Sequence, residues 1–169
     1  MKSMLLRHRR LSAAAASAVV LYAIARFVNL AIGESASGTA LSAGDIPYVG
    51  AILQPMATEG PITYAYSCHP HGGGTCTLSG NTAPVALEEF CRAANISFSL
   101  DGTEIQNRDE IIAYLKDAFS RSATLHDWNG TTTESTKVLF CFGSPFRKLY
   151  GVYDPDTQHF AMWIQFTEV

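Results

Sequence analysis

The strongest periodic pattern in the chain lies between Asn107 and Arg121. Its apolar residues recur at the spacing of a single helix face: Ile111, Ile112, Leu115, Ala118 and Phe119. Asn107 suits the N-cap, and Glu110 three residues later completes a capping box. We therefore predict a capped amphipathic helix with one stripe against a core. A second helix is predicted from Pro84, a residue favoured in the first turn, to about Ala94.

Strands are predicted in the rest of the C-terminal part. The segments with alternating or strand-type composition are 62–66, 96–100, 123–128, 137–143, 148–153 and 159–167. In the last segment one face is wholly apolar and must be buried, with Phe160, Met162, Ile164 and Phe166. Trp163 lies on the other face, where we expect a second covered surface, a partner contact or a concave pocket. Helices combined with antiparallel strands predict an α+β domain.

Residues 11–32 form an apolar segment of another kind, rich in alanine. They would make a helix of about 33 Å at about 1.5 Å per residue, enough to cross a hydrocarbon core of about 30 Å. Arg26 lies inside this window, where it either snorkels to the interface or meets a carboxylate of another chain. Small residues four apart, such as Ala14 and Ala18, allow close helix packing. We predict a transmembrane helix whose Ala14, Ala18 and Arg26 contact partners.

The chain thus divides into four predicted parts. A basic arm covers residues 1–10 and precedes the transmembrane helix at 11–32. Residues 33–59 are predicted to be a linker or extended arm, because small residues dominate its first half. Its second half, from Tyr48 to Met56, is expected to lie against another surface as a short ordered turn. A single α+β domain is expected at 60–169, with a mostly antiparallel sheet packed on helices.

Charge is distributed unevenly along the chain. No acidic residue precedes Glu34, whereas the same stretch contains several basic ones: Lys2, Arg7, Arg9, Arg10 and Arg26. This composition is typical of mitochondrial targeting, and the positive-inside rule leaves the N-terminus on the matrix side. We predict a single-pass protein of the mitochondrial inner membrane. The alternatives are a cleaved presequence, a signal peptide, or a type II secretory-pathway protein with sequons at Asn95 and Asn129.

Composition also excludes some classes of function. The formal net charge is -3 and no basic patch follows the opening, so nucleic acid is not an expected partner. Four cysteines are too few for a disulfide framework. Cys68 and Cys76 bracket a Gly-rich loop, and a bridge between them is left open. The expected partners are the lipid bilayer and other subunits of a membrane complex.

One resemblance concerns the fold. Phe98–Gly102 ends in an Asp-Gly turn, and the capped helix that follows opens with Arg108-Asp-Glu-Ile111. This order of elements, over about residues 84–169, resembles the nuclear-transport-factor-like superfamily, which includes ketosteroid isomerase. The resemblance implies a cone-shaped domain around a pocket. Its acid or base would come from a small set of residues: His126, Asp127, Tyr150 or Tyr153. His126 and Asp127 are adjacent in a predicted strand and so face opposite sides.

A second resemblance is chemical. Tyr66-Ser-Cys-His-Pro-His-Gly72 is similar to the His-Pro-His-Gly signature of the diacylglycerol and monoacylglycerol acyltransferases. It implies that His71 would activate an acceptor hydroxyl as a general base. The same segment offers four zinc-type ligands: Cys68, His69, His71 and Cys76. Pro70 and the alternation of adjacent side chains oppose their convergence, so we predict no metal and no cofactor.

These observations lead to one functional hypothesis. We predict a non-catalytic accessory subunit, with a structural or assembly role, in a multisubunit complex of the mitochondrial inner membrane. The respiratory chain and the ATP synthase are the favoured contexts, with Trp163 as a partner-contact candidate in the folded domain. The alternatives are a membrane-anchored enzyme that uses the His69–His71 loop, and a ligand-binding pocket of the nuclear-transport-factor type.

Overall fold

The computed structural model describes residues 17, 19–22, 24, 33–69, 72–98, 108–122, 128–143 and 146–167. Within the predicted transmembrane segment, Ser17, 19–22 and Ile24 are helical and exposed. No helix among the described residues is both long and apolar enough to cross a membrane. Most of 11–32, including Ala14, Ala18 and Arg26, lies outside those residues. The transmembrane helix and its contacts therefore stay predictions.

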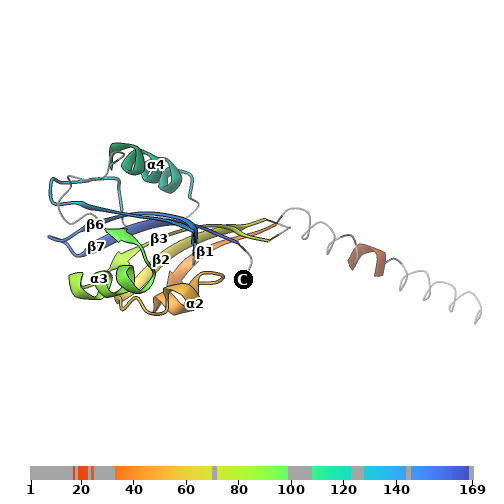
Figure 1. Ribbon diagram of the computed structural model, residues 1–169. Helices are drawn as coiled ribbons and strands as arrows, with labels where there is room; N and C mark the ends of the chain where they lie inside the picture. Colours follow the sequence, from red (N-terminus) through yellow and green to blue (C-terminus); the bar gives the residue numbers. More distant parts are fainter. Residues whose placement is uncertain are drawn as a thin grey trace, which may run out of the picture. The chain divides into compact units, whose positions relative to one another are not determined.

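A seven-stranded sheet is the framework of the folded unit, which comprises Ser35–Cys68 and Gly72–Val169 (Figure 1). The strands are β1 (Glu34–Ala40), β2 (Glu59–Cys68), β3 (Gly74–Asn81), β4 (Ser97–Phe98), β5 (Lys137–Gly143), β6 (Phe146–Asp154) and β7 (His159–Phe166). Their order across the sheet is β1-β2-β3-β7-β6-β5-β4. The six strands from β2 to β4 in this order pair antiparallel. The predicted α+β class with a mostly antiparallel sheet is confirmed.

Helices cover both faces of this sheet. Figure 1 shows α4 (Arg108–Ser120) on one face, and α2 (Gly50–Leu53) and α3 (Pro84–Ala93) on the other. A short 3-10 helix, η1 (Ala43–Asp45), precedes α2. Pro84 opens α3 as predicted, since its missing N–H and fixed φ suit the first turn.

The larger core lies on the face that α2 and α3 cover. Its central side chains come from the sheet and from α3 and are at most 1% exposed: Ile62, Leu78, Phe90, Leu149 and Phe160. Each such burial contributes about 1.5–3 kcal/mol of transfer free energy. The face of β7 predicted to be buried belongs to this core.

The smaller core lies beneath α4. The helix buries Ile111, Ile112, Leu115 and Phe119, which is the stripe that the helical periodicity predicts. These side chains pack on strand residues from β5, β6 and β7: Val138, Val152, Ala161 and Trp163. Trp163 is 8% exposed, so the predicted second covered surface is present.

The segment at 33–59 contains more structure than its composition suggests. It holds β1, η1 and α2, and the compact unit begins at Ser35 rather than near Gly60. Ile46, Val49 and Leu53 are at most 2% exposed and belong to the larger core. The turn predicted to lie against another surface therefore packs on the sheet of its own chain, because these few apolar residues are enough to dock it.

β1 and β3 are the strands that the sequence pattern did not reveal. In β3, Cys76 and Leu78 alternate with Thr75, Thr77 and Ser79, but this short run lies between glycines and has the composition of a loop. The predicted strand at 123–128 cannot be compared, since 123–127 lies outside the described residues, and Trp128 is not in a strand. His126, Asp127, Asn107 and the Asp101-Gly102 turn also lie outside them.

Candidate functional site

Strand register aligns the side chains of the α4 face in three rows that cross the sheet. The rows are Thr63–Ser79–Ala161–Val152–Val138, Ala65–Thr77–Trp163–Tyr150–Phe140 and Ser67–Thr75–Gln165–Lys148–Phe142. Apart from Ala161, the β5 to β7 positions carry the larger side chains, whereas the β2 and β3 positions carry only Ser, Thr and Ala. The two halves of this face are therefore chemically different.

A groove lies over the half with small residues. It has a volume of about 600 Å³ and runs over β1, β2, β3 and β7 beside the C-terminal end of α4. Its lining residues are Ser35, Ala36, Ser37, Ala65, Tyr66, Ser67, Thr75, Thr77, Tyr114, Ala118, Arg121, Ser122 and Trp163. This volume lies within the range of about 300–1,000 Å³ that is usual for ligand sites.

Hydroxyl groups dominate the floor and one edge of the groove. Thr77 Oγ1 donates to the carbonyl oxygen of Ala65 at 3.4 Å and to Ser122 Oγ at 3.3 Å, which ties the floor to the end of α4. Ser35, Ser37 and Ser67 are exposed. Because a hydroxyl both donates and accepts, this floor can pair with either half of an amide.

Aromatic rings form the wall between the groove and the rest of the sheet. Trp163 packs edge-on against Tyr114, with ring centroids 4.9 Å apart, and stacks on Tyr150 at 6.0 Å. Burial is the main cause that raises the pKa of Tyr114, and the nearby Tyr150 is the second. Arg121 opposes this shift. The Tyr114 hydroxyl is therefore protonated at neutral pH and available as a donor, and 39% of the residue is exposed.

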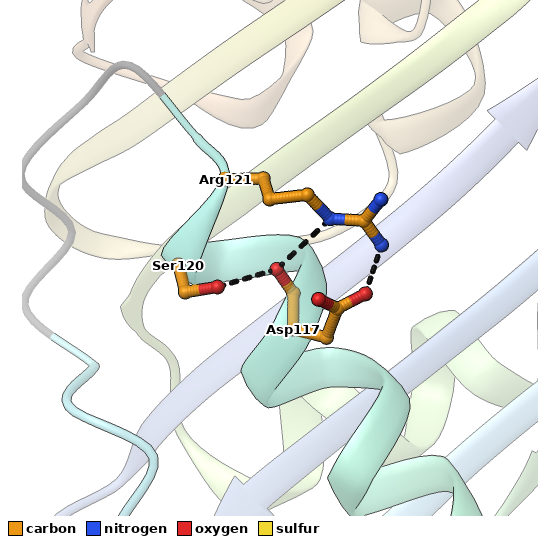
Figure 2. Close-up of polar contacts among 3 residues, drawn as sticks. All are labelled: Asp117, Ser120 and Arg121. Carbon is orange, nitrogen blue, oxygen red and sulfur yellow. Dashed lines mark hydrogen bonds and ion pairs between the residues drawn. The ribbon is translucent and has the colours of Figure 1, made fainter.

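Arg121 is the charged residue among the groove-lining residues that the structure describes. Figure 2 shows it turned back along α4, where its guanidinium pairs with the carboxylate of Asp117. The Asp117 carbonyl oxygen accepts from Ser120 Oγ at 2.8 Å and from Arg121 Nε at 3.4 Å. These bonds satisfy the C-terminal turn of α4 and hold a cation at the rim of the groove.

The tyrosines predicted as pocket acids lie elsewhere. Neither Tyr150 nor Tyr153 lines the groove. Tyr153 is fully buried in the larger core, and its hydroxyl donates to the Thr82 carbonyl oxygen at 3.1 Å. Burial, and then the nearby Glu59, raises its pKa. Tyr153 is therefore a neutral structural donor, and Tyr150 packs against the aromatic wall.

The cysteine and histidine residues of the Gly-rich loop are not brought together in the described part of the chain. No group of three or more metal-type ligands occurs among the described residues, and Pro70 and His71 lie outside them. Cys76 is fully buried, and burial followed by the nearby Cys68 raises its pKa to about 12.

The structure forms no disulfide between Cys68 and Cys76. Cys68 pairs with Gly74, which makes Cys76 its diagonal neighbour on the adjacent strand. Diagonal Cα atoms lie about 7–8 Å apart, beyond the usual disulfide range of about 4.4–6.8 Å. This register therefore does not suit a disulfide between Cys68 and Cys76.

Sequence reasoning found Trp163 and missed the rest of the groove. Most lining residues are Ser, Thr and Ala, which give no signal until strand register places them on one face. No family model, curated protein or solved structure matches the chain. Function must therefore be argued from the groove itself and from the sequence.

Proposed function

We propose that the protein is a non-catalytic accessory subunit of a multisubunit complex in the mitochondrial inner membrane, and that its groove holds an extended segment of a neighbouring subunit. The observation that carries the proposal is the half-covered α4 face, where a hydroxyl-lined groove of about 600 Å³ adjoins an aromatic wall. The respiratory chain and the ATP synthase are the assemblies that we favour.

The chemistry of the groove favours a polypeptide as its occupant. The hydroxyls of Ser67, Thr75 and Ser122 can match both amide N–H and carbonyl groups of an extended chain. Trp163 and Tyr114 supply the amphipathic aromatic surface that is enriched in protein interfaces. A groove with this mixture suits binding and positioning rather than proton transfer.

The anchor is the second part of the proposal. Residues 11–32 cross the inner membrane with the N-terminus in the matrix, supported by the acid-free, arginine-rich opening. Ala14, Ala18 and Arg26 contact transmembrane helices of partner subunits. The folded unit then lies in the intermembrane space.

A small-ligand pocket is the second candidate function. The volume of the groove favours it, as does its position between α4 and the sheet, where the nuclear-transport-factor-like resemblance implies a pocket. This candidate function implies that the domain has the cone-shaped fold of the nuclear-transport-factor-like superfamily. If the groove is a small-ligand pocket, the purified protein should retain a small molecule rather than a partner subunit.

The test is purification of the full chain in mild detergent, followed by a native gel and mass spectrometry of the comigrating proteins. A stoichiometric set of respiratory-chain or ATP synthase subunits is expected. A lone monomer or homodimer would contradict the accessory role, and native mass spectrometry of that species would then reveal a bound small molecule if the second candidate is correct.

A pair of tryptophan variants tests the groove. Ser67→Trp places a large ring on the exposed floor and should release the partner subunits, because the ring fills the space of the bound segment. Val85→Trp is the matched control, since Val85 is 66% exposed and lies on α3, the helix that covers the opposite face of the sheet. Equal retention of partners by both variants would show that the groove is not the contact.

A further inference from the structure

An exposed aromatic residue stands at the end of β5. Phe142 is 62% exposed, and its ring lies 5.9 Å from Tyr150 in an edge-on arrangement. A single exposed aromatic residue is common on protein surfaces. What distinguishes Phe142 is the set of residues around it.

A lysine is held directly over these rings. Lys148 Nζ lies 5.5 Å from the centroid of Phe142 and 5.3 Å from that of Tyr150, so cation–π attraction keeps charge and aromatic surface together. Arg147, the neighbour of Lys148 in β6, is exposed. We call Phe142, Lys148 and Tyr150 the hairpin patch.

The two ends of the sheet differ in charge, although each carries both signs: Glu34 opens β1 at the patch end, and Lys137 opens β5 at the other end. Phe142 and Lys148 belong to the row Ser67–Thr75–Gln165–Lys148–Phe142, and Lys148 and its neighbour Arg147 place cations at this end. At the opposite end, register aligns Glu59, Asn81, His159 and Asp154, and the exposed Glu134 and Asp156 lie in the adjoining turns. A negatively charged surface would therefore favour the patch end over the other end.

The chain enters the folded unit at this same end of the sheet. Ser35 and Ser37 of β1 line the groove together with Ser67 and Thr75, which belong to the row that ends at Phe142. The start of β1 and the hairpin patch therefore lie toward the same end of the sheet.

We infer that the hairpin patch docks onto an anionic phospholipid surface and holds the folded unit against the membrane. Aromatic rings prefer the headgroup region, and ammonium and guanidinium groups pair there with lipid phosphates. The inference rests on the proposed function for the anchor, which delivers the sheet end to the bilayer. The residues of the hairpin patch lie in β5 and β6 and are not part of the anchor.

The test uses the full chain reconstituted in vesicles of phosphatidylcholine with or without phosphatidylglycerol, each prepared with ordinary or brominated acyl chains. Phe142→Trp should add fluorescence that brominated lipids quench, and the quenching should be stronger with phosphatidylglycerol. Val85→Trp should add fluorescence that they do not quench. In the Phe142→Trp background, Lys148→Gln should weaken the anionic-lipid contact about fivefold.

Two outcomes would overturn docking. One is the absence of added quenching at position 142, and the other is equal quenching at positions 142 and 85. Alkaline extraction of the same vesicles afterwards reports separately on the anchor: loss of the protein would contradict the transmembrane part of the proposed function. Quenching is measured before extraction, so the contact of the hairpin patch with the membrane is tested whether or not the anchor is retained.

Discussion

The hydroxyl of Tyr153 in β6 donates a hydrogen bond of 3.1 Å to the backbone carbonyl oxygen of Thr82, just before α3. Both residues are 0% exposed. Thr82 Oγ1 in turn donates to the Ala57 carbonyl oxygen at 2.6 Å, and the Thr82 N–H donates to the Gln158 carbonyl oxygen at 3.0 Å. Thr82 thus joins the start of α3, the segment before β2 and the β6–β7 turn.

Removing the Tyr153 hydroxyl should destabilise the protein. Tyr153→Phe leaves the buried Thr82 carbonyl oxygen without this donor, which costs about 1–3 kcal/mol. Urea unfolding of the full chain in detergent, followed by tryptophan fluorescence, measures the change. Tyr150→Phe is the control and should change stability by less than about 0.5 kcal/mol, since Tyr150 is only half-buried. Equal midpoints for the two variants would show that the Tyr153 bond adds nothing.

Gly74 should not tolerate a side chain. A Cβ there would lie 2.9 Å from Cys68 Cα and 2.9 Å from Phe166 Cζ, and still nearer the Ser67 carbonyl oxygen. Gly74→Ala should therefore cost about 3 kcal/mol, because backbone of β2 must shift. Gly80→Ala is the control on the same strand, where the nearest atoms are 3.4 Å away. Thermal midpoints that fall equally in both variants would contradict the steric argument.

Alkaline pH should destabilise the fold through its buried thiols. The pKa of Cys76 is raised from 9.0 to about 12, chiefly by burial. Above pH 9 the thiol ionises in the unfolded chain but stays protonated in the folded one. The stability it contributes is therefore complete below pH 9 and is lost as the pH rises towards 12.

Cys76→Ala should flatten this pH dependence. The slope of unfolding free energy against pH should fall by up to about 1.4 kcal/mol per pH unit, the share of one thiol. Burial, and to a lesser extent Glu88, raises the pKa of Cys91 to about 12. Cys91 therefore supplies a similar slope, which remains in the Cys76→Ala variant. Urea unfolding just above pH 9 measures both proteins. An unchanged slope would mean that Cys76 ionises as readily in the folded protein as in the unfolded chain.

Arg121 should matter for binding more than for stability. Its side chain is 71% exposed and that of Asp117 is 57% exposed, and ion pairs of this kind contribute only about 0–1 kcal/mol. Arg121→Gln should therefore unfold at nearly the same urea concentration as the wild type. On the native gel it should lose partner subunits if the bound segment carries a carboxylate at the rim of the groove. A large loss of stability would instead give Arg121 a structural role.

The elements that the sequence predicted well are those rich in large apolar residues. The stripe of α4 agrees with the structure because this helix buries one face, whereas β5 and β7 were recognised by their apolar and aromatic content although they contribute to both cores. The apolar residues of α3 marked that helix in the same way, and Pro84 marked its start.

The groove could not be read from the sequence because its floor avoids apolar residues. Thr75, Thr77 and Ser79 occupy the α4 face of β3, while Cys76 and Leu78 point into the larger core. Small and hydroxyl residues between glycines have the composition of a loop, so both β1 and β3 escaped the pattern. Only the pairing of β3 with β2 and β7 brings these hydroxyls together.

The central place of β7 has a consequence for how the protein is made. β7 follows the other six described strands in the sequence and joins the β1–β2–β3 part of the sheet to the β4–β5–β6 part, with Gly74 beside Phe166 and Asn81 beside His159. Until residues 159–166 have left the ribosome or the translocation channel, β3 and β6 each present an unpaired edge. The nascent chain therefore depends on late, long-range strand insertion, and chaperones that shield these edges should govern its yield.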